Sequence, residues 1–377
     1  MSEQPAPHTG STWHCLSGGG EMGALMRAHD WSDSPLGAVE QWPRSLLTVV
    51  GLMLSSRYPI LVLWGPELRQ LYNDAFRPIL GDSKHPVTLG RAAHETWAEA
   101  WHVIGAMLHG VLATGEAVAA ENMAVPIERR GYLEETYFTF SYDPIRDDEG
   151  RVAGVFVVCQ ETTRQVLQER RVHLVRDLMA QAASARTVVD AAHAAGEVLS
   201  AHRADLPFFL LCLKDKRGTL RLSCAAGLST DLNTARRTLE QTEFASWSTD
   251  QVHAAGGLLL LGEVAERLAP LSLGKRGATQ AAVVQLSRPG PAEALGYLIA
   301  GLHPRRPLDD DQRAFLAMVG AQLAASFLNA GAYEDAHERA QEAVRVERAR
   351  PEEAQRQLAE AERATRSREQ TLAIVSH

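Results

Sequence analysis

The feature that most constrains the fold of this sequence is an alternating stretch within residues 133–145. One set of alternate residues is apolar or β-branched and consists of Thr136, Phe138, Phe140 and Tyr142. The residues between them, Tyr137, Thr139 and Ser141, are more polar. Alternate residues of a β-strand point to opposite faces of a sheet, so this segment predicts a strand with one buried face. The acidic, glycine-containing segment RDDEGR (146–151) then predicts a hairpin turn into a second strand, RVAGVFVVCQE (151–161).

The segments before this hairpin predict a mixture of strands and helices. PILVLWG (59–65) and LRQLYND (68–74) predict two short strands, DAFRPIL (74–80) a short helix, and ENMAVPIER (121–129) a further strand. Apolar residues at helical spacing predict a helix over 98–115, with Gly115 as its C-cap. We therefore expect a five-stranded antiparallel sheet with helices on one face.

The length, the net charge and the cysteines of the chain limit the number of domains, the class of partner and the compartment. The chain has 377 residues, which predicts two or three domains. Its 46 acidic and 38 basic residues give a net charge of −8, which argues against nucleic acid as a partner. The four cysteines, Cys15, Cys159, Cys212 and Cys224, form no CxxC pair and indicate free thiols in a reducing compartment.

The terminal and apolar segments bear on localisation. No apolar run approaches the roughly 20 residues of a membrane span, and the N-terminus lacks the pattern of a secretory signal. We therefore predict a cytoplasmic protein with no membrane association. Residues 1–30 are polar and glycine-rich, and SGGGEMG (17–23) lacks the Lys-Ser/Thr pair of a phosphate-binding loop. This segment is predicted to be a flexible lead-in.

Several motifs in residues 31–165 resemble PAS domains at the front of soluble bacterial sensor histidine kinases. They are DWSDSPLG (30–37), QWPRSL (41–46), WGPELRQLYNDAF (64–76) and EETYFTFSYDPIRDDEGRVAGVFV (134–157). The segment CQETT (159–163) is similar to the acidic-then-Thr signature with which PAS domains pass a signal to the next helix, with Glu161 where Asp is more usual. The resemblance implies a PAS-like sensor domain over 31–165.

Residues 166–185 and 186–332 predict a linker helix and a second sensor domain. Leu167, Leu174 and Leu178 share one face of the linker helix, which either connects or transmits a signal. The second domain has a helix, a strand pair turning at 216–218, a less defined region over 229–277, two more strands around 289–291 and a closing helix. LGYLIAGLHPRRPLDDDQRAFLAMVGAQLAASFLNA (295–330) resembles a GAF domain.

The C-terminal segment 333–377 is rich in helix-forming Ala, Glu, Arg and Gln. Spacings of three and four through Val344, Leu358 and Leu372 predict a coiled coil of two parallel copies, and a single solvated helix is the alternative. Pro351 lacks the N–H that an interior helical residue needs, so a kink or break is expected there.

The last ten residues, REQTLAIVSH, resemble the start of the phosphoacceptor motif of histidine kinases. The resemblance implies that His377 accepts the γ-phosphoryl group of ATP and passes it to the receiver domain of a response regulator. It also implies a homodimer through the C-terminal helix. The ATP- and Mg²⁺-binding catalytic domain of such kinases is not among the 377 residues.

Histidines, aromatic residues and cysteines are the side chains in the two domains that could contact a sensor ligand. His85, His94, His102 and His109 lack the spacing of a metal site, so we predict no metal. Trp97, Trp101, Phe138 and Phe140 form either the lining of a ligand pocket or a plain apolar core. The sequence does not identify a possible small-molecule signal. Cys224 lacks the surroundings that a bilin chromophore would need, so no cofactor is predicted.

The sequence as a whole predicts an α+β protein. Two mixed sheet-and-helix sensor domains, PAS-like and then GAF-like, are joined by helical linkers and followed by a long C-terminal coiled-coil helix. The function expected is the cytoplasmic sensory region of a two-component histidine kinase. The alternative is a PAS–GAF sensing or oligomerisation module with no kinase activity.

Overall fold

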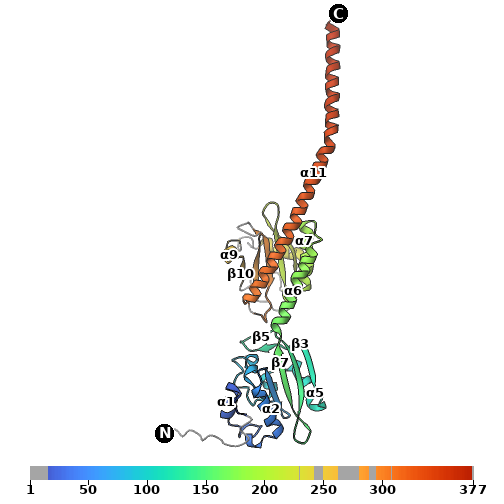
Figure 1. Cartoon of the computed structure of the whole chain (residues 1–377). Helices are drawn as coiled ribbons and strands as arrows, with labels where there is room; N and C mark the ends of the chain where they lie inside the picture. Colours follow the sequence, from blue (N-terminus) through green and yellow to red (C-terminus); the bar gives the residue numbers. More distant parts are fainter. Residues whose placement is uncertain are drawn as a thin grey trace. The chain divides into compact units, whose positions relative to one another are not determined.

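The computed structural model describes residues 16–228, 230–241, 249–261, 280–287, 294–306 and 308–375. The chain divides into two compact units, unit 1 over Met1–Arg170 and unit 2 over Arg171–His377. Each unit contains a five-stranded antiparallel sheet with helices packed against it (Figure 1), so the predicted α+β class is confirmed.

Unit 1 is built on a sheet with the strand order β2-β1-β7-β6-β3, in which all neighbours are antiparallel. The five-stranded sheet predicted from the sequence is therefore present. In chain order the elements are α1 (Gly20–Ala28), η2 (Val39–Gln41), α2 (Arg44–Ser55), β1 (Ile60–Trp64), β2 (Arg69–Tyr72), η3 (Asp74–Phe76), α3 (Arg77–Leu80), α4 (Ala93–Thr96), α5 (Trp101–Thr114), β3 (Val118–Ala124), β4 (Ile127–Glu128), β5 (Leu133–Glu134), β6 (Tyr137–Arg146), β7 (Val152–Glu161) and the start of α6 (Thr163–Ala182).

Helices cover both faces of this sheet, and the expectation of helices on one face was wrong. Leu61 and Leu63 of β1 face the same space as Leu108 of α5. Val62 lies between them and must point to the opposite face, yet it is fully buried. Because α2 contacts β1 and β2, it covers this second face, and its apolar residue Met53 joins the same core.

The N-terminal segment is a packed part of unit 1 from residue 16 onward, so the flexible lead-in predicted for residues 1–30 was wrong for residues 16–30, while residues 1–15 lie outside the described residues. Met22 and Met26 of α1 are fully buried in the core. The carboxylate of Asp74 accepts hydrogen bonds from the backbone N–H groups of Glu21 (3.0 Å) and Met22 (2.8 Å). These bonds satisfy two donors that the first turn of a helix leaves unpaired, and they hold α1 against the domain.

The predicted hairpin between β6 and β7 is confirmed and has a second role. Its tip residue Asp148 accepts hydrogen bonds from the backbone N–H groups of Arg44 (3.3 Å) and Ser45 (3.0 Å). These groups begin α2, whose own N-cap residue, Pro43, makes no side-chain cap. The hairpin therefore caps a helix about a hundred residues earlier in the chain.

Unit 2 contains an antiparallel sheet with the strand order β10-β11-β12-β8-β9. The strand pair and the two later strands lie where the sequence predicted them, and β10 lies in the region that the sequence left undefined. The predicted turn at 289–291 lies outside the described residues. After α6, the elements are α7 (Val188–Ala201), β8 (Phe209–Lys214), β9 (Leu220–Ala226), α8 (Leu232–Gln241), α9 (Thr249–Ala254), β10 (Leu258–Leu261), β11 (Ala281–Ser287), β12 (Ala294–Gly301) and α11 (Asp310–Val375).

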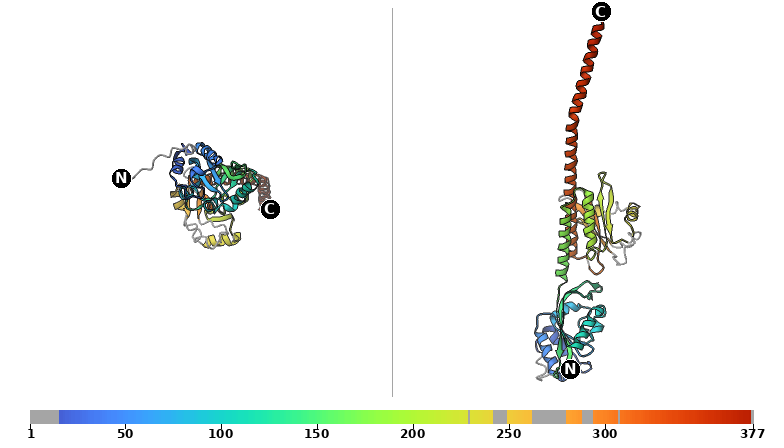
Figure 2. Two further views of the ribbon diagram at one scale, coloured as in Figure 1. Left: turned by 90° about the horizontal axis from the view of Figure 1, so that it is seen from below. Right: turned by 90° about the vertical axis from the view of Figure 1, so that its right-hand side faces the viewer.

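The two faces of the unit 2 sheet belong to two separate apolar clusters. Leu211 of β8 packs in the cluster that includes residues of α6, α7 and α11. Its neighbour Leu210 packs in the cluster that includes Ala235 of α8 and Val252 of α9. Two views show α6, α7 and α11 together on the first face (Figure 2).

The segment 166–185 is not a separate linker. Leu174 is fully buried and Leu178 nearly so, both in the core of unit 2. Arg171 donates a hydrogen bond of 2.6 Å to the side chain of Gln312 at the start of α11, and its guanidinium lies over the ring of Phe315. The second half of α6 is therefore part of unit 2, while its first turns belong to unit 1.

Helix α11 runs without interruption from Asp310 to Val375, so of the kink or break expected at Pro351, the break is absent. Asp309 caps the start of α11 by accepting a hydrogen bond of 2.8 Å from the N–H of Gln312. The coiled coil is not tested by a single copy.

The two halves of α11 differ in their environment. Leu316, Val319 and Leu323 are fully buried against the unit 2 sheet. Farther along, Val344 and Leu358 are exposed. Within the described residues, Asp310–Arg348 is the one helical stretch long and apolar enough to cross a membrane, and half of its apolar window is buried inside unit 2. That burial is what a core helix of a folded domain requires.

Candidate functional site

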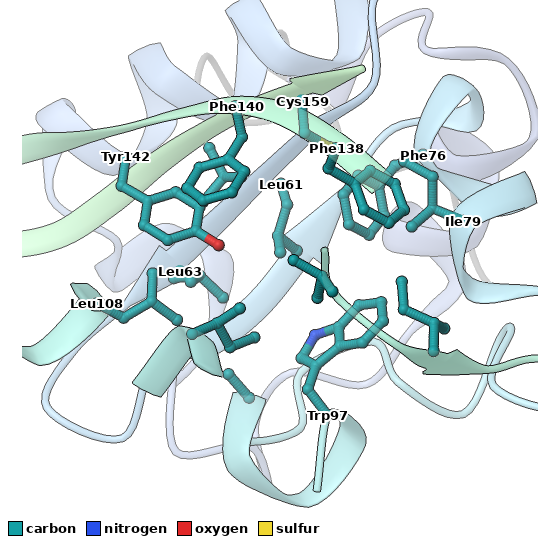
Figure 3. A pocket seen from close by; sticks show the side chains of 15 residues that line it. Leu61, Leu63, Phe76, Ile79, Trp97, Leu108, Phe138, Phe140, Tyr142 and Cys159 are labelled. Atoms are coloured by element: carbon teal, nitrogen blue, oxygen red, sulfur yellow. The ribbon is translucent and has the colours of Figure 1, made fainter. Parts of the chain in front are cut away.

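A buried apolar cavity lies in unit 1 between the sheet and the segment that carries α3, α4 and α5. It has a volume of about 60 Å³, and each of the residues that line it is less than 8% exposed. Figure 3 shows aromatic side chains of the sheet on one side and Trp97 on the other. The lining residues are Leu61, Leu63, Phe76, Ile79, Ala93, Trp97, Ile104, Leu108, Val125, Ile127, Phe138, Phe140, Tyr142, Val157 and Cys159.

The alternating pattern of the sequence builds the sheet wall of this cavity. Phe138, Phe140 and Tyr142 are every second residue of β6, and all three line the cavity. Their register places Phe140 opposite Cys159 and Tyr142 opposite Val157 on β7. Opposite residues of paired strands lie on the same face, so the two strands present one continuous apolar surface.

The polar groups of the cavity wall are neutral. The indole Nε1–H of Trp97 donates a hydrogen bond of 2.7 Å to Oε1 of Gln70, whose Nε2 lies 2.7 Å from Oγ1 of Thr96. Burial raises the pKa of Tyr142 above its usual range and the pKa of the Cys159 thiol to about 12. Since charge in an apolar cavity without a partner is costly, the wall favours an uncharged ligand.

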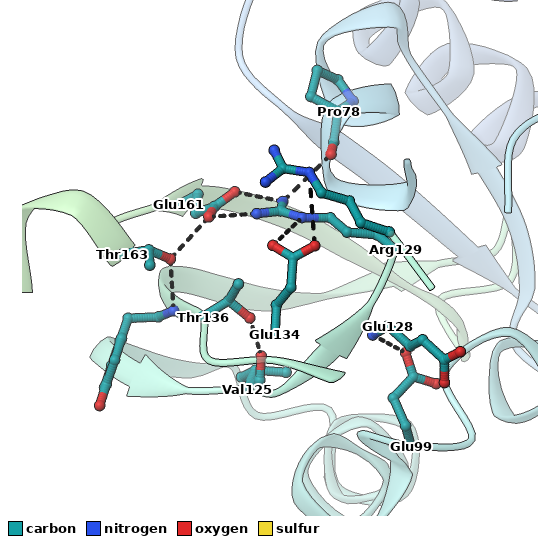
Figure 4. A network of polar contacts seen from close by, with 11 residues as sticks. Pro78, Glu99, Val125, Glu128, Arg129, Glu134, Thr136, Glu161 and Thr163 are labelled. Atoms are coloured by element: carbon teal, nitrogen blue, oxygen red, sulfur yellow. Dashed lines mark hydrogen bonds and ion pairs between the residues drawn. The ribbon is translucent and has the colours of Figure 1, made fainter. Parts of the chain in front are cut away.

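A short two-stranded arm, formed by β4 and β5, closes one side of the cavity. Ile127 of β4 lines the cavity, and Ile127 pairs with Glu134 of β5. Arg129 follows directly and donates two hydrogen bonds to the carboxylate of Glu161, of 2.8 Å and 2.9 Å. Its Nε also donates to Glu134 at 3.2 Å (Figure 4). The arm therefore joins the cavity wall to the end of β7.

Glu161 in turn contacts the first residue of α6. The hydroxyl of Thr163 donates a hydrogen bond of 2.9 Å to Glu161 and accepts one of 3.0 Å from the backbone N–H of Tyr137. Burial pushes the pKa of Glu161 upward, but the hydrogen bonds and charge of Arg129 lower it by more, so its pKa lies below the usual range. The carboxylate is therefore ionised and bound to Arg129 near neutral pH.

The other sensor-ligand candidates from the sequence are distributed differently. Trp97, Phe138 and Phe140 line the cavity, whereas Trp101 packs between the rings of His94 and His109 outside it. His94, His102 and His109 are exposed, and Nδ1 of His85 lies 3.0 Å from the hydroxyl of Tyr72. In the part of the chain that the structure describes, no three His, Cys, Asp or Glu side chains form a group that could hold a metal.

The cysteines are placed as buried or half-buried thiols. Cys159 and Cys212 are buried and Cys224 is half-buried on β9, where its Sγ lies 3.4 Å from the carbonyl of Ala192. Burial raises the pKa of each of these three thiols to about 12, which disfavours the reactive thiolate. Cys15 lies outside the described residues.

His377 also lies outside the described residues, so its phosphoacceptor role stays a prediction. The sequence pattern identified Glu161 but missed Arg129 and Glu134, and Arg129 pairs with both Glu134 and Glu161. The adjacent Arg129 and Arg130 within a strand-like segment were the available signal, because a charged pair in such a position needs acidic partners when it is covered.

Comparisons with known proteins give weak likenesses. No protein-family profile and no curated protein matches the chain. The GAF domain of an Acinetobacter phosphoenolpyruvate-protein phosphotransferase is 15% identical, with 42% of this chain and 93% of that chain covered and a TM-score of 0.31. The free methionine-R-sulfoxide reductase of Neisseria meningitidis is 18% identical, with 42% of this chain and 89% of that chain covered and a TM-score of 0.30. A sensory box sensor histidine kinase of Vibrio cholerae is 15% identical, with 31% of this chain and 90% of that chain covered and a TM-score of 0.22.

Proposed function

We propose that the chain is the cytoplasmic sensory region of a two-component histidine kinase. Unit 1 acts as a PAS-like domain whose cavity takes a small uncharged apolar molecule, and unit 2 acts as a GAF-like domain. The observation that carries the proposal is the β4–β5 arm, which lines the cavity with Ile127 and binds Glu161 beside α6 through Arg129.

The proposed relay follows a chain of direct contacts. A ligand that presses on Ile127 shifts the arm and therefore the position of Arg129. Arg129 carries this shift to Glu161, which holds Thr163 at the start of α6. Because α6 is one helix over Thr163–Ala182, its far end responds through Leu174 and Leu178 in the core that it shares with α11.

The output is proposed to lie at the end of α11. Two copies of this helix would pair along the predicted seam of exposed residues, among them Val344 and Leu358, and bring His377 to a catalytic domain that supplies ATP and Mg²⁺. A neutral imidazole nitrogen is a competent nucleophile near pH 7 and would attack the γ-phosphoryl group. The receiver domain of a response regulator would then accept the group.

A phosphorylation assay tests this proposal. With a histidine-kinase catalytic domain, ATP and Mg²⁺ supplied in trans, the wild-type chain should acquire an acid-labile phosphoryl group, and His377→Gln should acquire none. His337→Gln, at an exposed histidine of the same helix, is the matched control and should be labelled like the wild type. Equal labelling of His377→Gln would overturn the kinase assignment and favour a PAS–GAF module without kinase activity.

A further inference from the structure

Each residue that lines the apolar cavity is buried and at most 7% exposed, so little of the cavity wall faces solvent. Any ligand that exchanges with solvent must therefore move part of the wall. The sheet wall is held by continuous backbone ladders between β1, β7 and β6. The wall on the opposite side includes Trp97, which directly follows α4, a helix of four residues. This side has the least regular structure around the cavity.

A second, polar pocket of about 310 Å³ lies directly outside this wall. Thr96 and Glu99 line the polar pocket and flank Trp97 in the sequence, while Trp97 itself lines the cavity. The same division recurs on β4, where Glu128 lines the polar pocket and Ile127 lines the cavity. Neighbouring residues therefore line the cavity and the polar pocket, both around Trp97 and on β4.

An ion pair holds this wall in place. Lys84 and Glu99 form a largely buried ion pair, and Nζ of Lys84 lies 4.6 Å from the centre of the Trp97 ring. Oε1 of Glu99 also accepts a hydrogen bond of 3.0 Å from the backbone N–H of Glu128 (Figure 4). Lys84 thus ties the loop before α4 to the indole, and Glu99 ties the same point to the β4–β5 arm.

We propose that Trp97 is the gate of the cavity and that the Lys84–Glu99 ion pair is its latch, with the polar pocket as the entrance. This inference rests on the proposed function, because it assumes that the cavity takes a small uncharged apolar ligand. Breaking the ion pair releases the cation–π contact and the arm together and leaves the indole held by its hydrogen bond to Gln70, so the indole swings away more often and a ligand passes between the pocket and the cavity. The latch lies outside the cavity, so it sets the rate of exchange and not the affinity.

Xenon is a suitable probe because apolar protein cavities bind it without any polar contact. Its binding to the full chain is followed by the methyl resonances of Ile79 and Ile127, and its exchange rate by saturation-transfer NMR. Lys84→Met keeps the aliphatic stem and removes the charge. We expect it to raise the association and dissociation rates by about tenfold each, which corresponds to about 1.4 kcal/mol of lost latch energy. The dissociation constant should stay within about twofold of the wild-type value.

Two further variants make the test specific. Glu99→Gln keeps an acceptor for the N–H of Glu128 and should also accelerate exchange. Arg91→Met is the matched control, because Arg91 lines the same polar pocket without a cation–π contact or ion pair among the described residues, and its rates should equal those of the wild type.

The possible outcomes separate the gate from the proposed function. The gate is overturned if the exchange rates of Lys84→Met and Glu99→Gln equal those of the wild type. It is also overturned if only the dissociation rate changes, so that the dissociation constant changes with it. In both cases xenon binding still supports the cavity as a ligand site. If xenon shifts neither the Ile79 nor the Ile127 methyl resonance in any variant, the cavity is not a ligand site, and the proposed function fails together with the gate.

Discussion

Replacing Arg129 with Gln is expected to destabilise unit 1 by about 3–5 kcal/mol, the usual cost of removing one partner from a buried ion pair. The Arg129 side chain is 9% exposed and is the shared partner of Glu134 and Glu161, so its loss leaves two covered carboxylates without their cation. The measurement is equilibrium denaturation of the full chain followed by tryptophan fluorescence.

The adjacent arginine provides the control for this experiment. Arg130 is 66% exposed and its Nε lies 3.8 Å from Glu134, too far for a hydrogen bond. We expect Arg130→Gln to change the free energy of unfolding by less than about 0.5 kcal/mol. Equal effects of the two substitutions would show that the Arg129 network does not hold the arm.

The loss in Arg129→Gln should depend on pH. In the wild type, the pKa of Glu161 lies below its usual range although burial opposes this, because Arg129 stabilises the carboxylate. Its contribution to stability is present above the ordinary glutamate pKa of about 4.3 and is lost as the pH falls through the lowered folded-state pKa. The difference between wild type and variant should therefore shrink as the pH is lowered from 7 towards 3, and a constant difference would contradict the pairing.

Replacing Leu323 with Ala is expected to destabilise unit 2 by about 2–5 kcal/mol. Leu323 of α11 is fully buried in the core formed with α6, α7 and the sheet, and the substitution leaves a cavity there. Urea denaturation followed by circular dichroism measures the loss. Leu358→Ala, a change at a 63% exposed position of the same helix, should leave the unfolding of unit 2 unchanged.

The comparison of these two leucines also tests the place of α11. If Leu323→Ala were as mild as Leu358→Ala, the first half of α11 would not be a core helix, and the burial of its apolar window would need another explanation. Leu358→Ala should instead weaken self-association of the chain, measured by sedimentation, if the exposed half pairs with a second copy.

The parts of the fold that sequence patterns predicted are those fixed by local chemistry. The alternation through Phe138, Phe140 and Tyr142 predicted a strand with one buried face, and the acidic turn after it predicted the hairpin. Helix α5 and its C-cap, Gly115 with φ of 72°, followed from apolar spacing and from the left-handed conformation that glycine tolerates.

The parts that sequence patterns missed depend on contacts between distant residues. Helix α1 is fixed by Asp74, more than 50 residues later, and the glycine-rich segment before α1 gives no sign of this partner. Arg129 and Glu161 are 32 residues apart, and their pairing follows only from the position of the β4–β5 arm. The sequence left open whether Trp97, Phe138 and Phe140 line a pocket or a plain apolar core, because a cavity is the space left between side chains that are individually typical of a core.

The most direct test of the account is whether filling the cavity changes α6 through Arg129. Hydrogen exchange of the amides in residues 163–174 is measured in the full chain with and without xenon. In the wild type, xenon should slow this exchange, because a filled cavity holds the arm and Glu161 in place. In Arg129→Gln, xenon should still shift the Ile127 methyl resonance but leave the exchange of α6 unaltered. An equal response of α6 in both proteins, or none in the wild type with the cavity filled, would contradict the relay.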